Sequence, residues 1–168
     1  IRRGMGLVNE VFRDSLPEMP GHIAIGHVRY STTGSSLAAN IQPLLVSYAG
    51  GRIAMAHNGN LTNAPLLRKK LEQGGSVFQT TVDSEVIVNL IARSKKKNVE
   101  DRIVESMNQV EGAYCLVIMT EDRLIGLRDP NGFRPLCLGR MPDGGWVFAS
   151  ESCALDAVGA MMIRDVEP

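Results

Sequence analysis

The sequence predicts a mixed α+β domain in which strands come first, helices follow and strands return. Short apolar runs between turn residues fill the first and last thirds of the chain, whereas the middle third carries apolar residues at helical spacing. The length of 168 residues, with 44% apolar and 21% charged residues, suits one compact soluble domain with its own core. This order of elements favours layers of sheet and helix over a doubly wound parallel sheet.

Three strands are expected in the first part of the chain, over residues 22–28, 44–49 and 53–57. Gly50-Gly51 separates the second and third of these strands and is typical of a hairpin. Several expected strands are apolar on both faces, as in a sheet that is covered on each side.

Three helices are expected next, over residues 64–73, 84–94 and 99–110. Asn63 is suited to cap the first helix and Gly74-Gly75 to end it. The second and third helices each have one apolar face, made respectively by Val86, Ile87, Leu90 and Ile91, and by Ile103, Val104, Met107 and Val110. Gly112 is expected to close the third helix. Short strands then follow over 114–119, 123–127, 136–138, 146–149 and 161–166, with a short helix over 150–158 capped by Ser150.

Charge and cysteine usage exclude several classes of protein. Lys plus Arg and Asp plus Glu both number 18, so bulk charge favours neither a nucleic acid nor a membrane surface as partner. The three cysteines, Cys115, Cys137 and Cys153, have no regular spacing and indicate a reducing compartment, the cytoplasm. Cys115 and Cys137 are expected to be buried strand residues, and Cys153 a core residue of a short helix. Neither a bilayer-spanning segment nor a signal peptide is predicted.

Arg29 opens the first polar cluster, at the end of an expected strand and before a hydroxyl-rich loop. Arginine binds carboxylates through two hydrogen bonds, so this cluster suits an anionic ligand. A surface salt bridge with Ser and Thr in a plain turn explains the same residues, and the cluster alone slightly favours that interpretation.

Asn58-Gly59, inside the second polar cluster His57–Asn60, predicts a turn. A hairpin is one interpretation. The other is an oxyanion hole, because the Asn58 side-chain N–H and the Gly59 backbone N–H can both face a reacting carbonyl. A helix rather than a strand is expected after this turn, which weighs against a hairpin.

Asp83 stands before the second expected helix, where it either caps that helix or offers a carboxylate to an ammonium group. In a fourth cluster, residues 128–136, a Pro-Asn-Gly turn is flanked by Arg128 and Asp129, whose pairing would explain their presence, and nothing in the cluster suggests a catalytic group. The three histidines have no metal-ligand spacing with each other or with the cysteines.

Taken together, seven motifs resemble the class II glutamine amidotransferases, whose glutaminase domains are N-terminal nucleophile (Ntn) hydrolases. They are GHVRYSTTG (26–34), NIQPL (40–44), AHNGNLTN (56–63), VDSE (82–85), EGAY (111–114), RDPNGFRPL (128–136) and SESCALD (150–156). The resemblance covers the whole chain and is closest to members that act on phosphoribosyl pyrophosphate. It implies an αββα sandwich of two antiparallel sheets flanked by helices, incomplete at the N-terminus.

The resemblance also implies roles for particular residues. Arg29 would bind the α-carboxylate of glutamine, with Thr32 in the same pocket, and Asp83 would bind the α-ammonium. Asn58 and Gly59 would form the oxyanion hole. In this family the nucleophile is an N-terminal cysteine. Residues 1–168 lack the segment that carries it, so we expect this polypeptide to be inactive.

For the parent protein, the resemblance implies a glutaminase domain, partly represented by residues 1–168, followed by a phosphoribosyltransferase domain. Glutamine and phosphoribosyl pyrophosphate would be its substrates in the first step of purine synthesis, and the parent would be a homo-oligomer. No cofactor is expected in this segment, whereas the missing domain would bring Mg²⁺ and, in some members, an iron–sulfur cluster. The competing hypotheses are another class II amidotransferase and a non-catalytic binding domain of the same fold.

Overall fold

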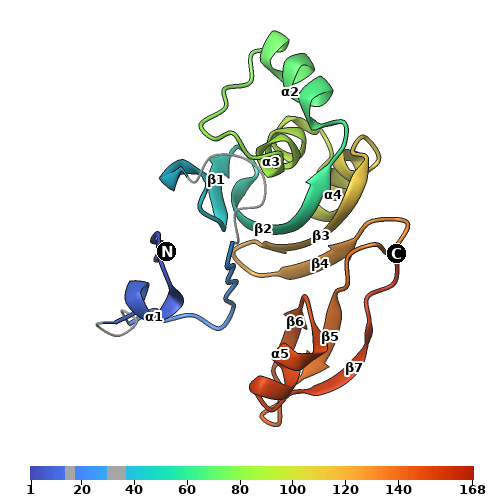
Figure 1. The fold of residues 1–168 in the computed structure, drawn as a ribbon. Coiled ribbons are helices and arrows are strands. Elements are labelled where there is room, and N and C mark those ends of the chain that lie inside the picture. Colours follow the sequence, from blue (N-terminus) through green and yellow to red (C-terminus); the bar gives the residue numbers. More distant parts are fainter. Residues whose placement is uncertain (14–17, 30–36) are drawn as a thin grey trace.

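The protein folds around two antiparallel sheets, as a computed structural model of residues 1–13, 18–29 and 37–168 shows (Figure 1). The larger sheet has the order β1-β2-β3-β4, with β1 Leu44–Tyr48, β2 Gly51–Leu61, β3 Gly112–Met119 and β4 Leu124–Arg128. The smaller sheet has the order β6-β5-β7, with β5 Cys137–Arg140, β6 Trp146–Ala149 and β7 Met161–Asp165. The predicted α+β class with two antiparallel sheets is confirmed.

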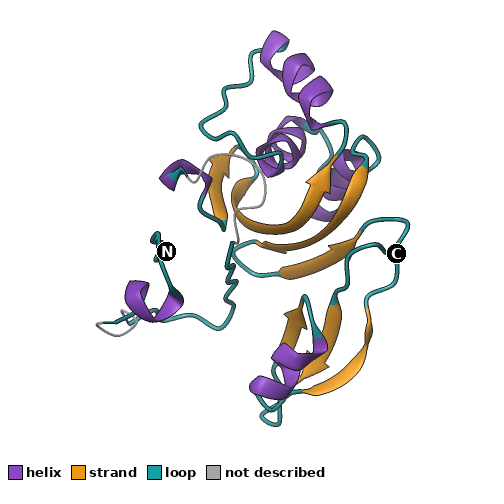
Figure 2. Ribbon diagram, in the orientation of Figure 1, coloured by secondary structure: helices purple, strands orange, loops and turns teal. Residues whose placement is uncertain are grey.

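Helices cover one side of the larger sheet, and the smaller sheet lies on its other side (Figures 1 and 2). The covering helices are α2 Ala64–Gln73, α3 Ser84–Arg93 and α4 Val99–Met107. Helix α5, Ser152–Ala157, contacts the smaller sheet. Two short helices, α1 Val8–Val11 and the 3₁₀ helix η1 Ala38–Asn40, precede β1.

The main core lies between α3 and the larger sheet. Ile87 and Ile91 of α3 are fully buried, as are Met55 of β2 and Ile118 of β3. The spacing of four between Ile87 and Ile91 places both on one face of the helix, which therefore packs along the sheet. This packing fixes the start of α3, at Ser84, relative to the end of β2.

The helices largely match their predicted ranges. Helix α2 has the predicted bounds, and Gly75 beyond its end adopts φ 86°. The prediction for α4 was wrong at its end. That helix stops at Met107, Val104 is 60% exposed, and Gly112 begins β3.

The strand predicted over residues 22–28 is absent. Burial alternates along these residues, with Ile23, Ile25 and His27 less exposed than their neighbours, so the chain is extended. It pairs with no strand among the described residues, however, and an extended chain without a ladder partner is not a strand. The apolar pattern thus matches the alternating burial of this segment, but it wrongly predicted a hydrogen-bonded strand.

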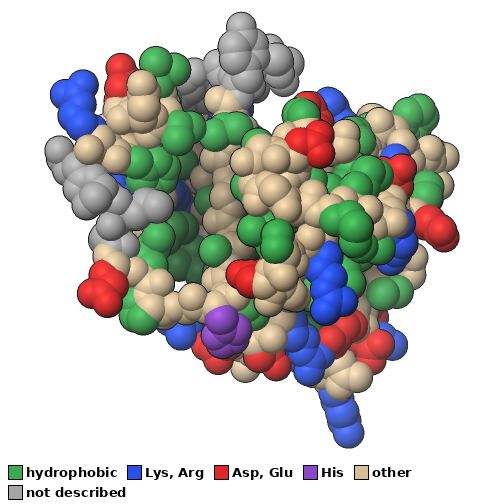
Figure 3. All heavy atoms as spheres, turned by 90° about the horizontal axis from the view of Figure 1, so that it is seen from below, with side chains coloured by type: hydrophobic (Ala, Val, Ile, Leu, Met, Phe, Trp, Pro, Cys, Tyr) green, Lys and Arg blue, Asp and Glu red, His purple; other side chains and the backbone are tan. Residues whose placement is uncertain are grey.

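The smaller sheet exposes much apolar surface. The exposed apolar side chains from this part of the chain are Trp146, Val158, Met161, Met162 and Ile163. Figure 3, which views the molecule from below, shows hydrophobic side chains among charged ones at the surface.

Cys153, predicted as a core residue of the short helix, is exposed. In the described parts of the chain, no helix is both long enough and apolar enough to cross a bilayer.

Candidate functional site

Asn58 and Gly59 lie within strand β2, so the prediction of a turn there was wrong. The strand continues to Leu61, and Asn58 and Gly59 stand opposite Cys115 and Tyr114 of β3. Gly59 has φ 151°, and a Cβ atom added there would lie 2.1 Å from the carbonyl oxygen of Ala113. Only glycine permits this approach of the two strands.

The end of β2 has an edge that β1 leaves open. β1 pairs with β2 only as far as Met55. Beyond it, the His57 N–H donates to Gln42 Oε1 (2.7 Å) and the Leu61 N–H donates to Asp83 Oδ2 (2.8 Å). Backbone groups alternate in direction along a strand, so the N–H of Gly59, midway between these two, is directed to the same edge. Asn58 is exposed and lies beside it.

Asp83 meets this edge from the start of α3. It occupies the N-cap position of α3 but makes no capping hydrogen bond with its side chain. Its carboxylate instead turns to β2, where it accepts the Leu61 N–H, and it also accepts the hydroxyl of Ser84 at 3.3 Å. The capping interpretation of Asp83 is therefore not supported.

Asp83 is ionised at neutral pH. Burial opposes this, but hydrogen bonding and charge attraction from His57, with the N–H groups of Leu61 and Ser84, outweigh it and lower the pKa of the carboxyl. A carboxylate that is 23% exposed can still meet a cationic group from solvent.

The His57 ring ties β2 to the start of α3. Its Nδ1 lies 2.8 Å from Ser84 Oγ and 3.5 Å from Asp83 Oδ1. The closer contact is to the Ser84 hydroxyl, which itself donates to Asp83. His57 therefore contacts the Asp83 carboxylate both directly and through Ser84. The ring Nε2 is buried and has no hydrogen-bond partner among the described residues.

The segment before residue 30 lies near the same ring. Burial, and then repulsion from His57 and Arg29, lower the pKa of His27, so these three side chains are close enough to interact. Arg29 itself is exposed. The structure thus brings Asn58, Gly59 and Asp83 together at the end of β2. Arg29 interacts electrostatically with His27, and Thr32 lies outside the described residues.

Two buried amide side chains that the sequence did not single out border this site. They are Asn40 and Gln42, which are 1% and 8% exposed. The available signal was the NIQPL motif (40–44), where the two amides stand among apolar residues, because amides that become buried there need partners.

Asp129 supports the site from the other side of β3. Fully buried, it accepts the N–H groups of Tyr114, Asn131, Phe133 and Arg134. Burial opposes ionisation, but these bonds outweigh it and lower the pKa of Asp129. Arg128 donates instead to the carbonyls of Gly132, Arg134 and Val166, so the predicted Arg128–Asp129 pair does not form.

The cysteines lie in environments that differ from that of an activated nucleophile. Burial raises the pKa of the Cys115 and Cys137 thiols, whereas nucleophilic cysteines have lowered values. Both are buried strand residues, as predicted. Within the described residues, no group of three His, Cys, Asp or Glu side chains could hold a metal ion.

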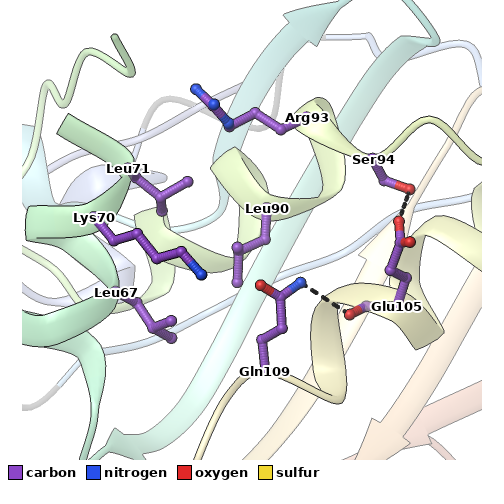
Figure 4. Close-up of a pocket in the computed structure, with 8 residues that line it drawn as sticks. All are labelled: Leu67, Lys70, Leu71, Leu90, Arg93, Ser94, Glu105 and Gln109. Carbon is purple, nitrogen blue, oxygen red and sulfur yellow. Dashed lines mark hydrogen bonds between the residues drawn. The ribbon is translucent and has the colours of Figure 1, made fainter. Parts of the chain in front are cut away.

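A separate hollow of about 220 Å³ lies at the other end of α3 (Figure 4). Leu67 and Leu90 line it, and Lys70 extends toward Gln109 across it. Glu105 closes one side through a hydrogen bond from Ser94. Asp83 precedes the first residue of α3, whereas Leu90 is near its last, so this hollow is distinct from the site around β2.

Comparison with known proteins identifies the class. The model of the glutamine amidotransferase domain matches residues 27–157. This range includes Arg29, Asn58, Gly59 and Asp83, and it covers more than half of the chain. The chain therefore belongs to the glutamine amidotransferase domain family.

Individual relatives show which members of this family the chain is similar to. The chain is 52% identical to amidophosphoribosyltransferase 2, chloroplastic, of Arabidopsis thaliana, over 98% of this chain and 30% of that protein. It is 49% identical to the amidophosphoribosyltransferase of Bacillus subtilis, over 99% of this chain and 35% of the other. A solved structure of the allosteric regulatory enzyme of purine biosynthesis superposes with a TM-score of 0.91 at 49% identity, covering 97% of this chain and 35% of that chain. The chain thus spans about a third of the length of these relatives.

Proposed function

We propose that this domain binds glutamine and catalyses release of its side-chain nitrogen as ammonia. The observation that carries the proposal is the placement of an ionised Asp83 carboxylate on the open edge of β2, beside the Gly59 N–H. A free amino acid is a zwitterion, so its site needs an anion and a cation as well as donors for its reacting carbonyl. Asp83 supplies the anion and the pair Asn58-Gly59 the donors at one strand end, and we assign the cation to Arg29.

Each residue has one role in this proposal. Asp83 binds the α-ammonium, and Arg29 binds the α-carboxylate with Thr32 in the same pocket. A cysteine thiolate attacks the amide carbon, and Asn58 Nδ2 and the Gly59 N–H stabilise the oxyanion that forms. The proton that the cysteine thiol loses passes to the amide nitrogen, and collapse of the intermediate then breaks the C–N bond and releases ammonia. Water then hydrolyses the thioester to glutamate. We assign the thiolate to a cysteine of the whole protein other than Cys115, Cys137 and Cys153.

We propose further that residues 1–168 are part of the glutaminase domain of an amidophosphoribosyltransferase. The support is the identity of about half the residues with proteins of that name. In the whole enzyme, ammonia would displace pyrophosphate from phosphoribosyl pyrophosphate and give phosphoribosylamine, the first step of purine synthesis. A separate phosphoribosyltransferase domain would hold Mg²⁺ and, as in some family members, an iron–sulfur cluster. We propose a homo-oligomer in the cytoplasm, although the Arabidopsis relative is named chloroplastic.

Kinetics of the whole natural protein that contains residues 1–168 test the glutaminase site. We expect Asn58→Ala to lower kcat for glutamine hydrolysis about 100- to 1000-fold, the loss typical of removing one oxyanion donor. We expect Asp83→Asn to act mainly by raising the KM for glutamine. Asp122→Asn is the matched control, because Asp122 is an exposed carboxylate in the turn between β3 and β4. Absence of ammonia release by the wild-type protein would refute the proposal.

A further inference from the structure

The segment Asn40–Pro43 contacts both halves of the candidate site. It runs from the end of η1 to the start of β1, and its two amide side chains are almost completely buried. Burying an amide removes its hydration, which is costly unless hydrogen bonds replace it. Both amides have such bonds, and the partners belong to the two segments that carry the proposed glutamine ligands.

Gln42 completes the open edge of β2 immediately before the oxyanion residues. Its Oε1 accepts the His57 N–H at 2.7 Å, and its Nε2 donates to the His57 carbonyl at 3.3 Å. The side chain therefore takes the place of one residue of a neighbouring strand. The His57 carbonyl belongs to the peptide that joins His57 to Asn58, so Gln42 fixes the plane from which Asn58 and then Gly59 extend.

Asn40 holds the segment that leads to Asp83. Its Nδ2 donates to Thr81 Oγ1 at 2.8 Å, and its Oδ1 accepts the Thr81 N–H at 3.0 Å. Thr81 lies two residues before Asp83. The two amides are themselves only two residues apart, so the distance between the oxyanion segment and the carboxylate is set through one short stretch of chain.

We propose that Gln42 and Asn40 are positioning residues of the glutamine site, with different effects on the reaction. Gln42 aligns the Asn58-Gly59 donors, which act in the transition state. Asn40 aligns Asp83, which contacts the bound substrate before and during the reaction. This inference rests on the proposed glutaminase function.

Substitutions of Gln42 and of Asn40 should therefore change different kinetic constants. Loss of an interaction made only in the transition state lowers kcat, whereas loss of ground-state binding raises KM. In the whole natural protein, we expect Gln42→Met to lower kcat for glutamine hydrolysis about 10- to 100-fold and to change KM less than about threefold. We expect Asn40→Leu to raise the KM for glutamine about 10-fold and to change kcat less than about threefold.

Conservative variants keep the test decisive if the apolar ones fold poorly. Asn40→Asp retains acceptors for both the N–H and the hydroxyl of Thr81, so its KM should stay close to the wild-type value. Gln42→Glu keeps the acceptor for the His57 N–H and loses the donor to its carbonyl. Its kcat should fall between those of wild type and Gln42→Met.

Asn63→Leu is the matched control. Asn63 makes the same two kinds of bond, donating to the Gln109 carbonyl (2.9 Å) and accepting the Glu111 N–H (3.0 Å), but it holds neither site segment. It should lower the melting temperature while leaving kcat and KM unchanged. Equal changes of kcat and KM in the Gln42 and Asn40 variants, or kinetics like those of the control, would overturn the inference. A wild-type protein without glutaminase activity would instead contradict the proposed function itself.

Discussion

Replacing Gly59 by alanine tests the close contact between β2 and β3 on which the oxyanion geometry depends. A Cβ atom at this position would lie 2.1 Å from the Ala113 carbonyl oxygen and 2.7 Å from the Tyr114 Cα. Both neighbours are backbone atoms of a paired strand, so neither can rotate away. The variant must separate the two strands at this point or change the φ of 151° at residue 59.

The expected loss of stability has two parts. A positive φ in a residue with a Cβ costs about 1–2 kcal/mol. Forcing extra volume into a packed region costs about 1–3 kcal/mol more. Gly59→Ala should therefore lower the free energy of unfolding by about 2–5 kcal/mol. Urea unfolding followed by far-UV circular dichroism measures this change.

Gly51→Ala separates the two contributions. Gly51 starts β2 with φ 119°, but an added Cβ would have no atom within 4 Å. This variant should show only the cost of the positive φ, about 1–2 kcal/mol. If Gly59→Ala is no more destabilising than Gly51→Ala, the close approach of β2 and β3 does not constrain residue 59 and the reasoning is wrong.

Three further outcomes are expected. Asp129→Asn should lower the free energy of unfolding by about 2–6 kcal/mol in urea titrations, because the amide leaves two of the four N–H donors around this buried side chain unsatisfied, at about 1–3 kcal/mol each. Asp83 has a lowered pKa in the folded state, so its ionised form stabilises the fold above the ordinary value of 3.8, and this contribution is lost as pH falls through the folded value. The stability difference between wild type and Asp83→Asn should therefore shrink in acid; a difference that grows would contradict the assignment. The polypeptide of residues 1–168 alone should release no ammonia from glutamine in a coupled assay. Cys115 and Cys137 are buried, and Cys153 lies on α5, which contacts the smaller sheet, whereas the candidate site lies at the end of β2.

Elements specified by local chemistry could be predicted from the sequence. Helix α2 has its predicted bounds because Pro65 and Gly74 act within a few residues of its ends. The strand conformation of Asn58-Gly59 could not be predicted in this way. Asn-Gly favours a turn locally, but pairing with Tyr114 and Cys115 keeps the strand extended, and these partners are more than 50 residues away.

The site shows the same division. The types of residue at Arg29, Asn58, Gly59 and Asp83 indicated a zwitterionic ligand, and the structure brings Asn58, Gly59 and Asp83 to one strand end. The contacts of Asn40 and Gln42 were not predictable from spacing, because Asn40 bonds Thr81 across 41 residues and Gln42 bonds His57 across 15. Side-chain amides report no partner in a sequence until the fold supplies one.

The open edge of β2 bears on how the protein avoids aggregation. A strand edge with free N–H and C=O groups is a template on which another chain can add a strand. Here Gln42 occupies both backbone groups of His57, and Asp83 occupies the N–H of Leu61. Of the three residues whose backbone groups face this edge, His57, Gly59 and Leu61, an incoming strand would find the first and the last already bonded to side chains. One of these side chains, Asp83, is ionised. The site can thus keep one backbone N–H directed outward without offering a continuous edge for intermolecular sheet formation.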